Sequence, residues 1–265
     1  MTVGLVPRRA AVVAALVGVL VLAGCTGAPD GGDEGRTGDG PSGDLTIFAA
    51  ASLSEAFEEL SAQFEVQHPD VDILPISYDG SSVLATQLLE GAAADVFASA
   101  DERNMAKVVD AGLAAGTEAF ATNTMQIAVA PDNPEDVDSL ASLADDDLIV
   151  VMCAAEVPCG AAAHALLDAA GAEVTAASEE QNVTAVLAKV KSGEADAGLV
   201  YRTDIAAARG SVEAIDIEGA DQARNVYPIS ALADAANPEA AEAFVDFVLS
   251  DEGQSVLSDF GFGAP

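Results

Sequence analysis

The stretch Phe48-Ala49-Ala50-Ala51-Ser52-Leu53 lies where a β-rich run gives way to a helical pattern. The apolar run over residues 45–50 favours a buried strand, and the amphipathic spacing that begins at Leu53 favours a helix. Ser52 is followed three residues later by Glu55, which is the spacing of a capping box. The turn therefore either caps its own helix or offers a hydroxyl and free backbone N–H groups to an anion.

Strand and helix patterns alternate along the rest of the chain. We expect strands over residues 45–50, 71–77, 95–99, 125–130, 148–152, 197–201, 212–217 and 226–232. We expect helices over residues 53–66, 82–90, 102–111, 160–170, 182–191 and 238–249, and a short one near 251–258. Such alternation is typical of an α/β protein in which helices cover a mostly parallel sheet.

Two lobes explain this pattern better than one long sheet. We interpret the β-rich segments 125–130 and 226–233 as crossovers between the lobes, which makes a two-strand hinge. The first lobe is predicted to hold residues 44–122 and 226–265, and the second residues 123–225. Each lobe is expected to be a mostly parallel sheet flanked by helices, and the cleft between them is the natural ligand site.

The N-terminus reads as a targeting segment. Arg8 and Arg9 precede an apolar run of 14 residues, 10–23, which is short for a membrane span and suits a signal peptide. The run ends in Leu22-Ala23-Gly24-Cys25, which resembles a bacterial lipobox and predicts cleavage before Cys25 and acylation of its thiol. The alternative is ordinary cleavage after residue 23 or 24, with Cys25 incidental.

The predicted signal peptide, residues 1–24, is followed by a Gly-rich segment. Residues 26–43 contain seven Gly and two Pro among 18, a composition that cannot bury a core. We therefore predict that residues 25–43 form a flexible tether. Together with a lipid at Cys25, the tether would hold the protein at the outer face of the cell membrane.

The chain is strongly acidic. It has 10 Lys plus Arg against 44 Asp plus Glu, a net charge of −34, and loss of Arg8 and Arg9 with the signal peptide would leave 8 − 44 = −36. Such a charge argues against nucleic acid and against an anionic membrane surface as partners. It suits a soluble domain outside the cell.

Two cysteines remain if Cys25 is lipidated. Cys153 and Cys159 lie six residues apart, and in an oxidising compartment we expect them to form a disulfide. The alternative is a pair of reduced, buried thiols.

Several turns place small or polar residues before a helix. They are Ser52, Gly80-Ser81-Ser82, Pro158-Cys159-Gly160 and Asn182-Val183. Each offers unpaired backbone N–H groups at the positive end of a helix, where ligands of open α/β sheets bind. Tyr201 ends the strand-like run 197–201, and its hydroxyl either points into the cleft or packs against a lobe.

Five segments in this order resemble the molybdate-binding proteins of bacterial ABC uptake systems. They are Phe48-Ala49-Ala50-Ala51-Ser52-Leu53, Gly80-Ser81-Ser82-Val83-Leu84-Ala85, Ala94-Asp95-Val96-Phe97-Ala98-Ser99-Ala100-Asp101, Glu156-Val157-Pro158-Cys159-Gly160 and Gly198-Leu199-Val200-Tyr201. The resemblance covers essentially all of residues 44–265. It implies a two-lobed periplasmic binding protein of type II that delivers molybdate, or tungstate, to an ABC permease as a monomer.

The resemblance also implies the residues that hold the ligand. They are the hydroxyl and N–H of Ser52 and of Ser81, the N–H of Cys159 and of Val183, and the hydroxyl of Tyr201. No metal cation and no cofactor is implied. Known members often have Ala where this chain has Cys159, a change that a backbone contact tolerates. Oriented neutral donors can replace the hydration shell of a tetrahedral dianion, whereas a protonated oxyanion would bring an unmatched donor.

Other functions remain as alternatives. The same fold could bind sulfate, phosphate or a small organic solute, although a carboxylate ligand would favour an Arg fork, and we expect Arg202 to lie outside the cleft. A cysteine-dependent enzyme would need Cys159 to be free beside His164, and the sequence has no G-x-S-x-G, P-loop or H-E-x-x-H motif. A lipid-tethered interaction module would not need four donor turns.

Overall fold

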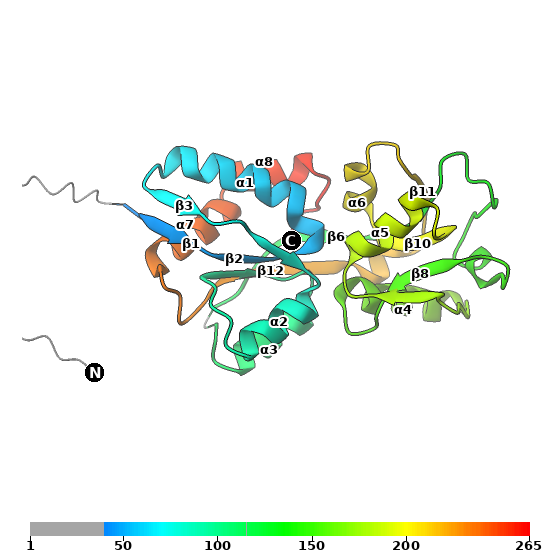
Figure 1. The fold of residues 1–265 in the computed structure, drawn as a ribbon, viewed down its shortest axis with the longest axis horizontal. Coiled ribbons are helices and arrows are strands. Elements are labelled where there is room, and N and C mark those ends of the chain that lie inside the picture. The colour runs from blue at the N-terminus through cyan, green and yellow to red at the C-terminus, as the bar shows by residue number, and fades with distance from the viewer. Residues whose placement is uncertain (1–39, 115) are drawn as a thin grey trace, which may run out of the picture. The chain divides into compact units, whose positions relative to one another are not determined.

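The computed structural model describes residues 40–114 and 116–265 (Figure 1). The predicted signal peptide, the predicted lipidation site Cys25 and tether residues 25–39 lie outside the described residues. None of the helices in the described part of the chain has both the length and the hydropathy that a membrane span needs.

The first lobe is built on a five-stranded sheet with the strand order β4-β2-β5-β12-β6. These strands are β4 (Ser77–Asp79), β2 (Ile47–Ala50), β5 (Val96–Ala98), β12 (Asn225–Ala231) and β6 (Glu118–Asn123). A separate parallel pair, β1 (Gly43–Leu45) and β3 (Val71–Ile73), lies beside it. The short 3-10 helix η1 (Ala51–Leu53) leads from β2 into α1.

Alternating side chains of this sheet pack against helices on both faces. Ile47 and Ala49 of β2 belong to a core with α1 (Ser54–Gln67), α7 (Pro238–Leu249) and α8 (Asp251–Asp259). Phe48, between them, belongs to a second core with α2 (Ser81–Leu89) and α3 (Glu102–Asp110). The period of two along a strand explains this division, because successive side chains point to opposite faces.

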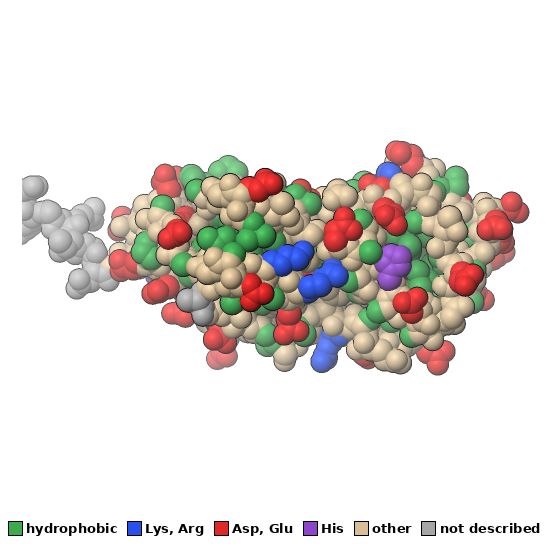
Figure 2. Space-filling view, turned by 90° about the horizontal axis from the view of Figure 1, so that it is seen from below, with side chains coloured by type: hydrophobic (Ala, Val, Ile, Leu, Met, Phe, Trp, Pro, Cys, Tyr) green, Lys and Arg blue, Asp and Glu red, His purple; other side chains and the backbone are tan. Residues whose placement is uncertain are grey.

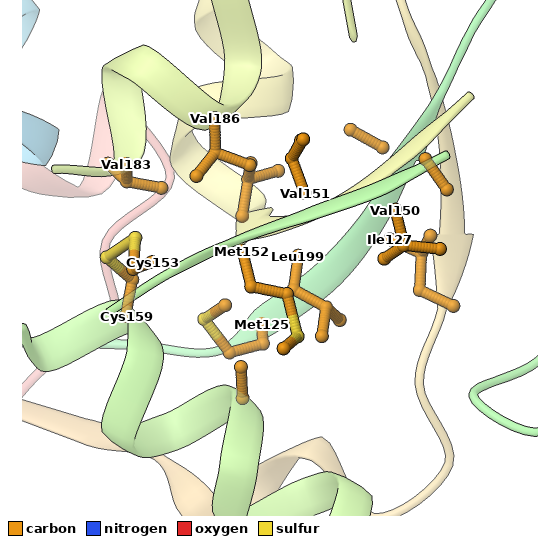
Figure 3. Close-up of a cluster of buried hydrophobic side chains, with 14 of the residues drawn as sticks. Met125, Ile127, Val150, Val151, Met152, Cys153, Cys159, Val183, Val186 and Leu199 are labelled. Atoms are coloured by element: carbon orange, nitrogen blue, oxygen red, sulfur yellow. A yellow bond between two sulfur atoms is a disulfide. The ribbon is translucent and has the colours of Figure 1, made fainter. Parts of the chain in front are cut away.

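The second lobe has a sheet of its own, with the strand order β11-β7-β10-β8-β9. Its elements are β7 (Met125–Val129), β8 (Val150–Cys153), β9 (Ser178–Glu180), β10 (Ala197–Tyr201), β11 (Glu213–Asp216), α4 (Pro158–Ala170), α5 (Val183–Ser192), α6 (Arg202–Ala207), η2 (Ser142–Ala144) and η3 (Ala220–Ala223). Figure 3 shows Met125, Ile127, Val151 and Leu199 packed in the core of this lobe.

Both sheets are mixed rather than mostly parallel. In the first, β2 pairs parallel with β4 and β5, whereas β12 pairs antiparallel with β5 and β6. In the second, β8 pairs parallel with β9 and β10, whereas β7 pairs antiparallel with β10 and β11. The predicted α/β class and two-lobed fold are confirmed. The expectation of mostly parallel sheets is wrong, because strands next to the lobe junction run against their neighbours.

The chain crosses from the first lobe to the second at Thr124, between β6 and β7. It returns where β12 begins, and Asn123 of β6 pairs with Asn225 of β12 at this junction. Segment 125–130 therefore belongs to the second sheet and is not itself the crossing strand. The sequence prediction also missed β6, β9 and α6, which are short or rich in Ala and polar residues.

Candidate functional site: a donor-lined cavity between the lobes

A small cavity of about 10 Å³ lies between the two lobes and contains all five predicted site residues. Ser81, Cys159, Val183 and Tyr201 in its lining are buried, and Ser52 is half-buried. The other lining residues are Ala50, Ala51, Asp79, Gly80, Ala100, Val157, Pro158 and Asn182. A cavity of this size holds about one water molecule, so a larger ligand needs the lobes to move apart around it, and each lobe contributes part of the wall.

The N-terminal ends of several helices meet at this cavity. Ser81 is the first residue of α2, Cys159 the second of α4, and Val183 the first of α5. The first turn of a helix leaves N–H groups without an intrahelical acceptor and carries a partial positive charge. The first N–H groups that bond back are those of Val83 in α2 and Ala161 in α4. The cavity is therefore surrounded by oriented N–H dipoles.

The Ser52 hydroxyl does not cap its helix. Neither η1 nor α1 has a side-chain cap at its N-terminus, so the capping box suggested by the Ser52 to Glu55 spacing is not formed. The 3-10 turn at residues 51–53 delays the start of α1 to Ser54. Instead, Ser52 Oγ lies 2.9 Å from the hydroxyl oxygen of Tyr227, a residue of β12 far along the chain.

Ser81 is fully buried at the wall of the cavity. Its hydroxyl oxygen accepts a hydrogen bond of 2.9 Å from the backbone N–H of Ala100. The helix starts at Ser81, one residue earlier than its pattern predicts, with Gly80 as the capping residue. The hydroxyl and the backbone N–H of Ser81 therefore both lie at the N-terminal end of α2.

Tyr201 carries a hydroxyl that is buried without a hydrogen-bond partner among the described residues. Tyr201 ends β10, is 1% exposed and is one of the residues that line the cavity. Burial raises the pKa of Tyr201 well above its ordinary value, and the charges of Tyr227 and Asp204 add to the rise. The hydroxyl is therefore a permanent donor whose natural complement is an acceptor in the cavity.

Asp204 lies close to this side of the site. Its carboxylate accepts a hydrogen bond of 2.8 Å from the backbone N–H of Tyr201. Burial raises the pKa of Asp204 to about 7, although that hydrogen bond opposes the rise. Its side chain lines a neighbouring, larger cavity of about 280 Å³ together with Glu55 and Arg209.

A disulfide joins Cys153 and Cys159, as predicted, with their Cα atoms 5.7 Å apart (Figure 3). It ties the end of β8 to the first turn of α4, which presents the Cys159 N–H. The next residue, Gly160, leaves no room for a side chain, because a Cβ there would lie 2.0 Å from the carbonyl oxygen of Ala154. With Cys159 oxidised, the Cys159–His164 pair lacks its nucleophile.

The two lobes touch each other around the cavity. Asp79 of the first lobe accepts a hydrogen bond of 2.8 Å from the side-chain amide of Asn182 in the second. Arg103 of α3 donates to the carbonyl oxygen of Glu156 at 2.9 Å. A Cβ at Gly80 would lie 2.0 Å from the carbonyl oxygen of Gln181. Sequence reasoning missed these contacts of Asp79, Arg103 and Asn182 because the partners are remote in the chain.

The lining of the cavity has no Lys, Arg or His side chain among the described residues. Its one carboxylate, Asp79, is already engaged by the Gly80 N–H at 2.7 Å and by Asn182. Arg202 is exposed and lines a different hollow, as expected. Figure 2 shows acidic side chains scattered over one face and few basic ones. The site therefore offers neutral donors within an acidic protein.

Comparison with known proteins identifies the class to which this chain belongs. The family model described as bacterial extracellular solute-binding protein matches residues 45–263, so the chain belongs to that family.

Named relatives agree with this assignment. The chain is 44% identical over 222 residues to the molybdate-binding protein ModA of Mycobacterium tuberculosis strain H37Rv, a match that covers 83% of this chain and 85% of the relative. It is 30% identical over 232 residues to ModA of Escherichia coli strain K12, covering 83% and 89%. These relatives are binding proteins, and this chain is likewise a solute-binding protein rather than an enzyme.

Solved structures share the fold. The periplasmic molybdate-binding protein of Azotobacter vinelandii superposes with a TM-score of 0.72 at 21% identity, covering 83% of this chain and 99% of that one. The sulfate-binding protein SubI of Mycobacterium tuberculosis gives a TM-score of 0.71 at 16% identity, covering 83% and 86%. At these identities the superpositions show the fold alone.

Proposed function

We propose that this protein captures molybdate, and tungstate equally, in the cavity between its lobes. The ligand is held by the hydroxyls and N–H groups of Ser52 and Ser81, the N–H groups of Cys159 and Val183, and the hydroxyl of Tyr201. No cofactor or metal cation takes part. The relatives that are named molybdate-binding proteins support the choice of ligand.

One observation supports the proposal most strongly: the buried Tyr201 hydroxyl has no partner in the described residues and faces a cavity lined by other donors. A buried polar group without a partner costs about 1–3 kcal/mol. A tetrahedral dianion offers only acceptors, so it complements every donor in the lining at once. Its negative charge is also stabilised by the converging helix N-termini.

We propose further that the two lobes and the N-terminal anchor serve the transport of the ligand. Lobe 1, residues 44–122 with 226–265, and lobe 2, residues 123–225, close over the ligand about the strands that join them. A lipid on Cys25, after removal of residues 1–24, holds the monomeric protein on the outer face of the membrane through the tether 25–43. From there it delivers the oxyanion to the permease of an ABC importer.

Titration calorimetry of the full chain with molybdate, tungstate, sulfate and phosphate tests the proposal. We expect micromolar or tighter binding of molybdate and tungstate, much weaker binding of sulfate, and the weakest binding of hydrogen phosphate, which carries a proton. Tight binding of sulfate without heat from either metal oxyanion would assign the site to sulfate instead. Mass spectrometry of the protein from its native membrane checks the lipid on Cys25.

A further inference from the structure

A chain of hydrogen bonds runs behind the cavity and ends on Ser52. Asn123, at the end of β6, contacts Tyr227 of β12, whose hydroxyl oxygen lies 2.9 Å from Ser52 Oγ. Tyr227 is fully buried and is absent from the lining of the cavity. It can therefore affect a ligand only through the lining residues it contacts, which are Ser52 by a hydrogen bond and Tyr201 by an edge-on contact between the rings.

Asn123 determines which groups donate and which accept in this series of hydrogen bonds. Its side-chain oxygen accepts the backbone N–H of Thr124 at 3.0 Å. Since a backbone N–H can only donate, this contact fixes which end of the amide is oxygen. The amide nitrogen then donates to Thr203 Oγ1 at 2.8 Å and to the Tyr227 hydroxyl oxygen at 3.4 Å. Tyr227 consequently receives a hydrogen bond from Asn123.

The Tyr227 hydroxyl makes two hydrogen bonds by distance, one with the Asn123 amide nitrogen, which can only donate, and one with Ser52, whose oxygen can accept the Tyr227 proton. If Ser52 donated to Tyr227 instead, the buried Tyr227 proton would have no partner, which is costly. Burial raises the pKa of Tyr227 above its ordinary value, so it keeps this proton at neutral pH. Tyr227 therefore donates to Ser52.

Ser81 shows the same arrangement by a different route. Its oxygen accepts the N–H of Ala100 at 2.9 Å, and a backbone N–H cannot reverse its role. In both serines an internal donor occupies one lone pair of the oxygen, so the hydroxyl proton is free to point into the cavity. Both serine hydroxyls thus accept from inside the lobe and donate toward the cavity. At Ser81 this direction is set by a backbone N–H, whereas at Ser52 it depends on the side chain of Tyr227.

We propose that Tyr227 is a positioning residue that makes Ser52 a hydrogen-bond donor to the ligand and thereby discriminates against oxyanions that carry a proton. This role rests on the proposed oxyanion-binding function. With Tyr227 donating to one lone pair of Ser52, a protonated oxyanion could donate only to the second lone pair, and the Ser52 proton would then turn away from the ligand, so that the hydrogen bond it donates to the ligand is lost. A fully deprotonated dianion accepts that hydrogen bond directly.

The variant Tyr227→Phe tests this role, with Tyr78→Phe as the matched control. Tyr78 is a tyrosine of the same lobe whose hydroxyl contacts Ser54 and Glu58 outside the cavity. Affinities for molybdate and for hydrogen phosphate are measured on the full chain at one neutral pH. In Tyr227→Phe we expect the affinity for molybdate to fall roughly tenfold while the affinity for hydrogen phosphate changes little. The ratio of molybdate affinity to phosphate affinity should therefore fall about tenfold. Tyr78→Phe should leave the ratio unchanged.

A double-mutant cycle separates this role from a structural one. In a Ser52→Ala background, Tyr227→Phe should cause no further loss of molybdate affinity, because its effect passes through Ser52. If Tyr227→Phe does not fold, Asn123→Asp tests the same hydrogen bond. The new carboxylate accepts the Tyr227 proton, which is then no longer donated to Ser52, so the ratio of molybdate affinity to phosphate affinity should again fall.

The outcomes distinguish this inference from the proposed function. A wild-type protein that binds molybdate, with an unchanged ratio in Tyr227→Phe, overturns the role of Tyr227 and leaves the function standing. An equal loss for molybdate and phosphate also overturns it, since that result marks a structural effect. A wild-type protein that binds no oxyanion contradicts both.

Discussion

The two lobes build their halves of the cavity from different chemical groups. The first lobe contributes two serine hydroxyls, at Ser52 and Ser81, each hydrogen-bonded to another group of its own lobe. The second contributes the first turns of two helices, at Cys159 and Val183, and one phenol at Tyr201. The first half therefore depends on which side chains are present, and the second depends mainly on backbone shape. This difference explains why a cysteine is acceptable at position 159.

The largest effect is expected from a side chain of the first lobe. Ser81→Ala removes a hydroxyl donor from a buried dianion site, which should cost about 1–3 kcal/mol of binding free energy, or roughly 5–150-fold in affinity. Calorimetry measures the change. Ser82→Ala is the matched control, because Ser82 is the next buried serine of α2 and does not line the cavity.

Truncating a side chain of the second lobe should affect ligand affinity less than truncating Ser81 in the first. Val183→Ala keeps the backbone N–H, so its affinity should stay within a few-fold of the wild type although the core loses packing. If Val183→Ala weakens binding as much as Ser81→Ala, the division between side-chain and backbone donors is wrong.

Gly80→Ala tests whether the lobes must approach closely. A Cβ at residue 80 would lie 2.0 Å from the Gln181 carbonyl oxygen across the cleft. Relieving such a contact typically costs 1–3 kcal/mol, so we expect affinity to fall about tenfold or more. Gly116→Ala, where a Cβ meets nothing within 4 Å, should bind normally. Normal binding by Gly80→Ala would mean that the lobes need not close this far.

Tyr201→Phe probes the one side-chain donor of the second lobe. It removes a buried hydroxyl that has no partner in the described residues, so molybdate affinity should drop roughly tenfold while the ligand-free protein gains stability. Calorimetry and thermal unfolding of the same samples measure both changes. A loss of both affinity and stability would show instead that the hydroxyl supports the fold.

Asp204, beside Tyr201, should make the stability of the protein depend on pH. Its pKa of about 7 means that the carboxyl ionises as the pH rises through 7. Because the unfolded carboxyl has its ordinary pKa near 4, the folded state binds more protons between about pH 4 and pH 7. The contribution of Asp204 to the free energy of unfolding is therefore greatest below about pH 4. It decreases between about pH 4 and pH 7 and stays constant above about pH 7.

The same ionisation places a negative charge near the cleft. We expect oxyanion affinity to weaken roughly two- to fivefold between pH 6 and pH 8, the size of a screened charge interaction. Calorimetry at several pH values measures it, and Asp204→Asn should abolish the dependence. An equal pH dependence in Asp204→Asn would assign the effect to another group or to the ligand.

The sequence predicts the fold and the residues of the cavity better than the arrangement around them. Strand and helix patterns are local, so the segments ending at Ser52 and Tyr201 and the start of α4 were predictable. The spacing of Cys153 and Cys159 predicted their disulfide correctly. The strand β6 was missed because its Ala-rich sequence is held in place by pairing with β12.

Long-range partners could not be predicted in the same way. Ser52 and Tyr227 are 175 residues apart, and Asp79 and Asn182 are 103 apart. No local pattern marks such pairs, and the Ser52 to Glu55 spacing indicated a capping box that the structure does not contain. The antiparallel strands near the junction are likewise a property of the topology.

The most direct test of the central claim is a crystal structure of the molybdate complex, with the metal located by anomalous scattering. We expect a single metal position in the cavity, with its oxygens within hydrogen-bonding distance of Ser52, Ser81, Tyr201 and the N–H groups of Cys159 and Val183, and no cation beside it. A metal position in the neighbouring cavity beside Arg209, or an oxyanion neutralised by a bound cation, would contradict it.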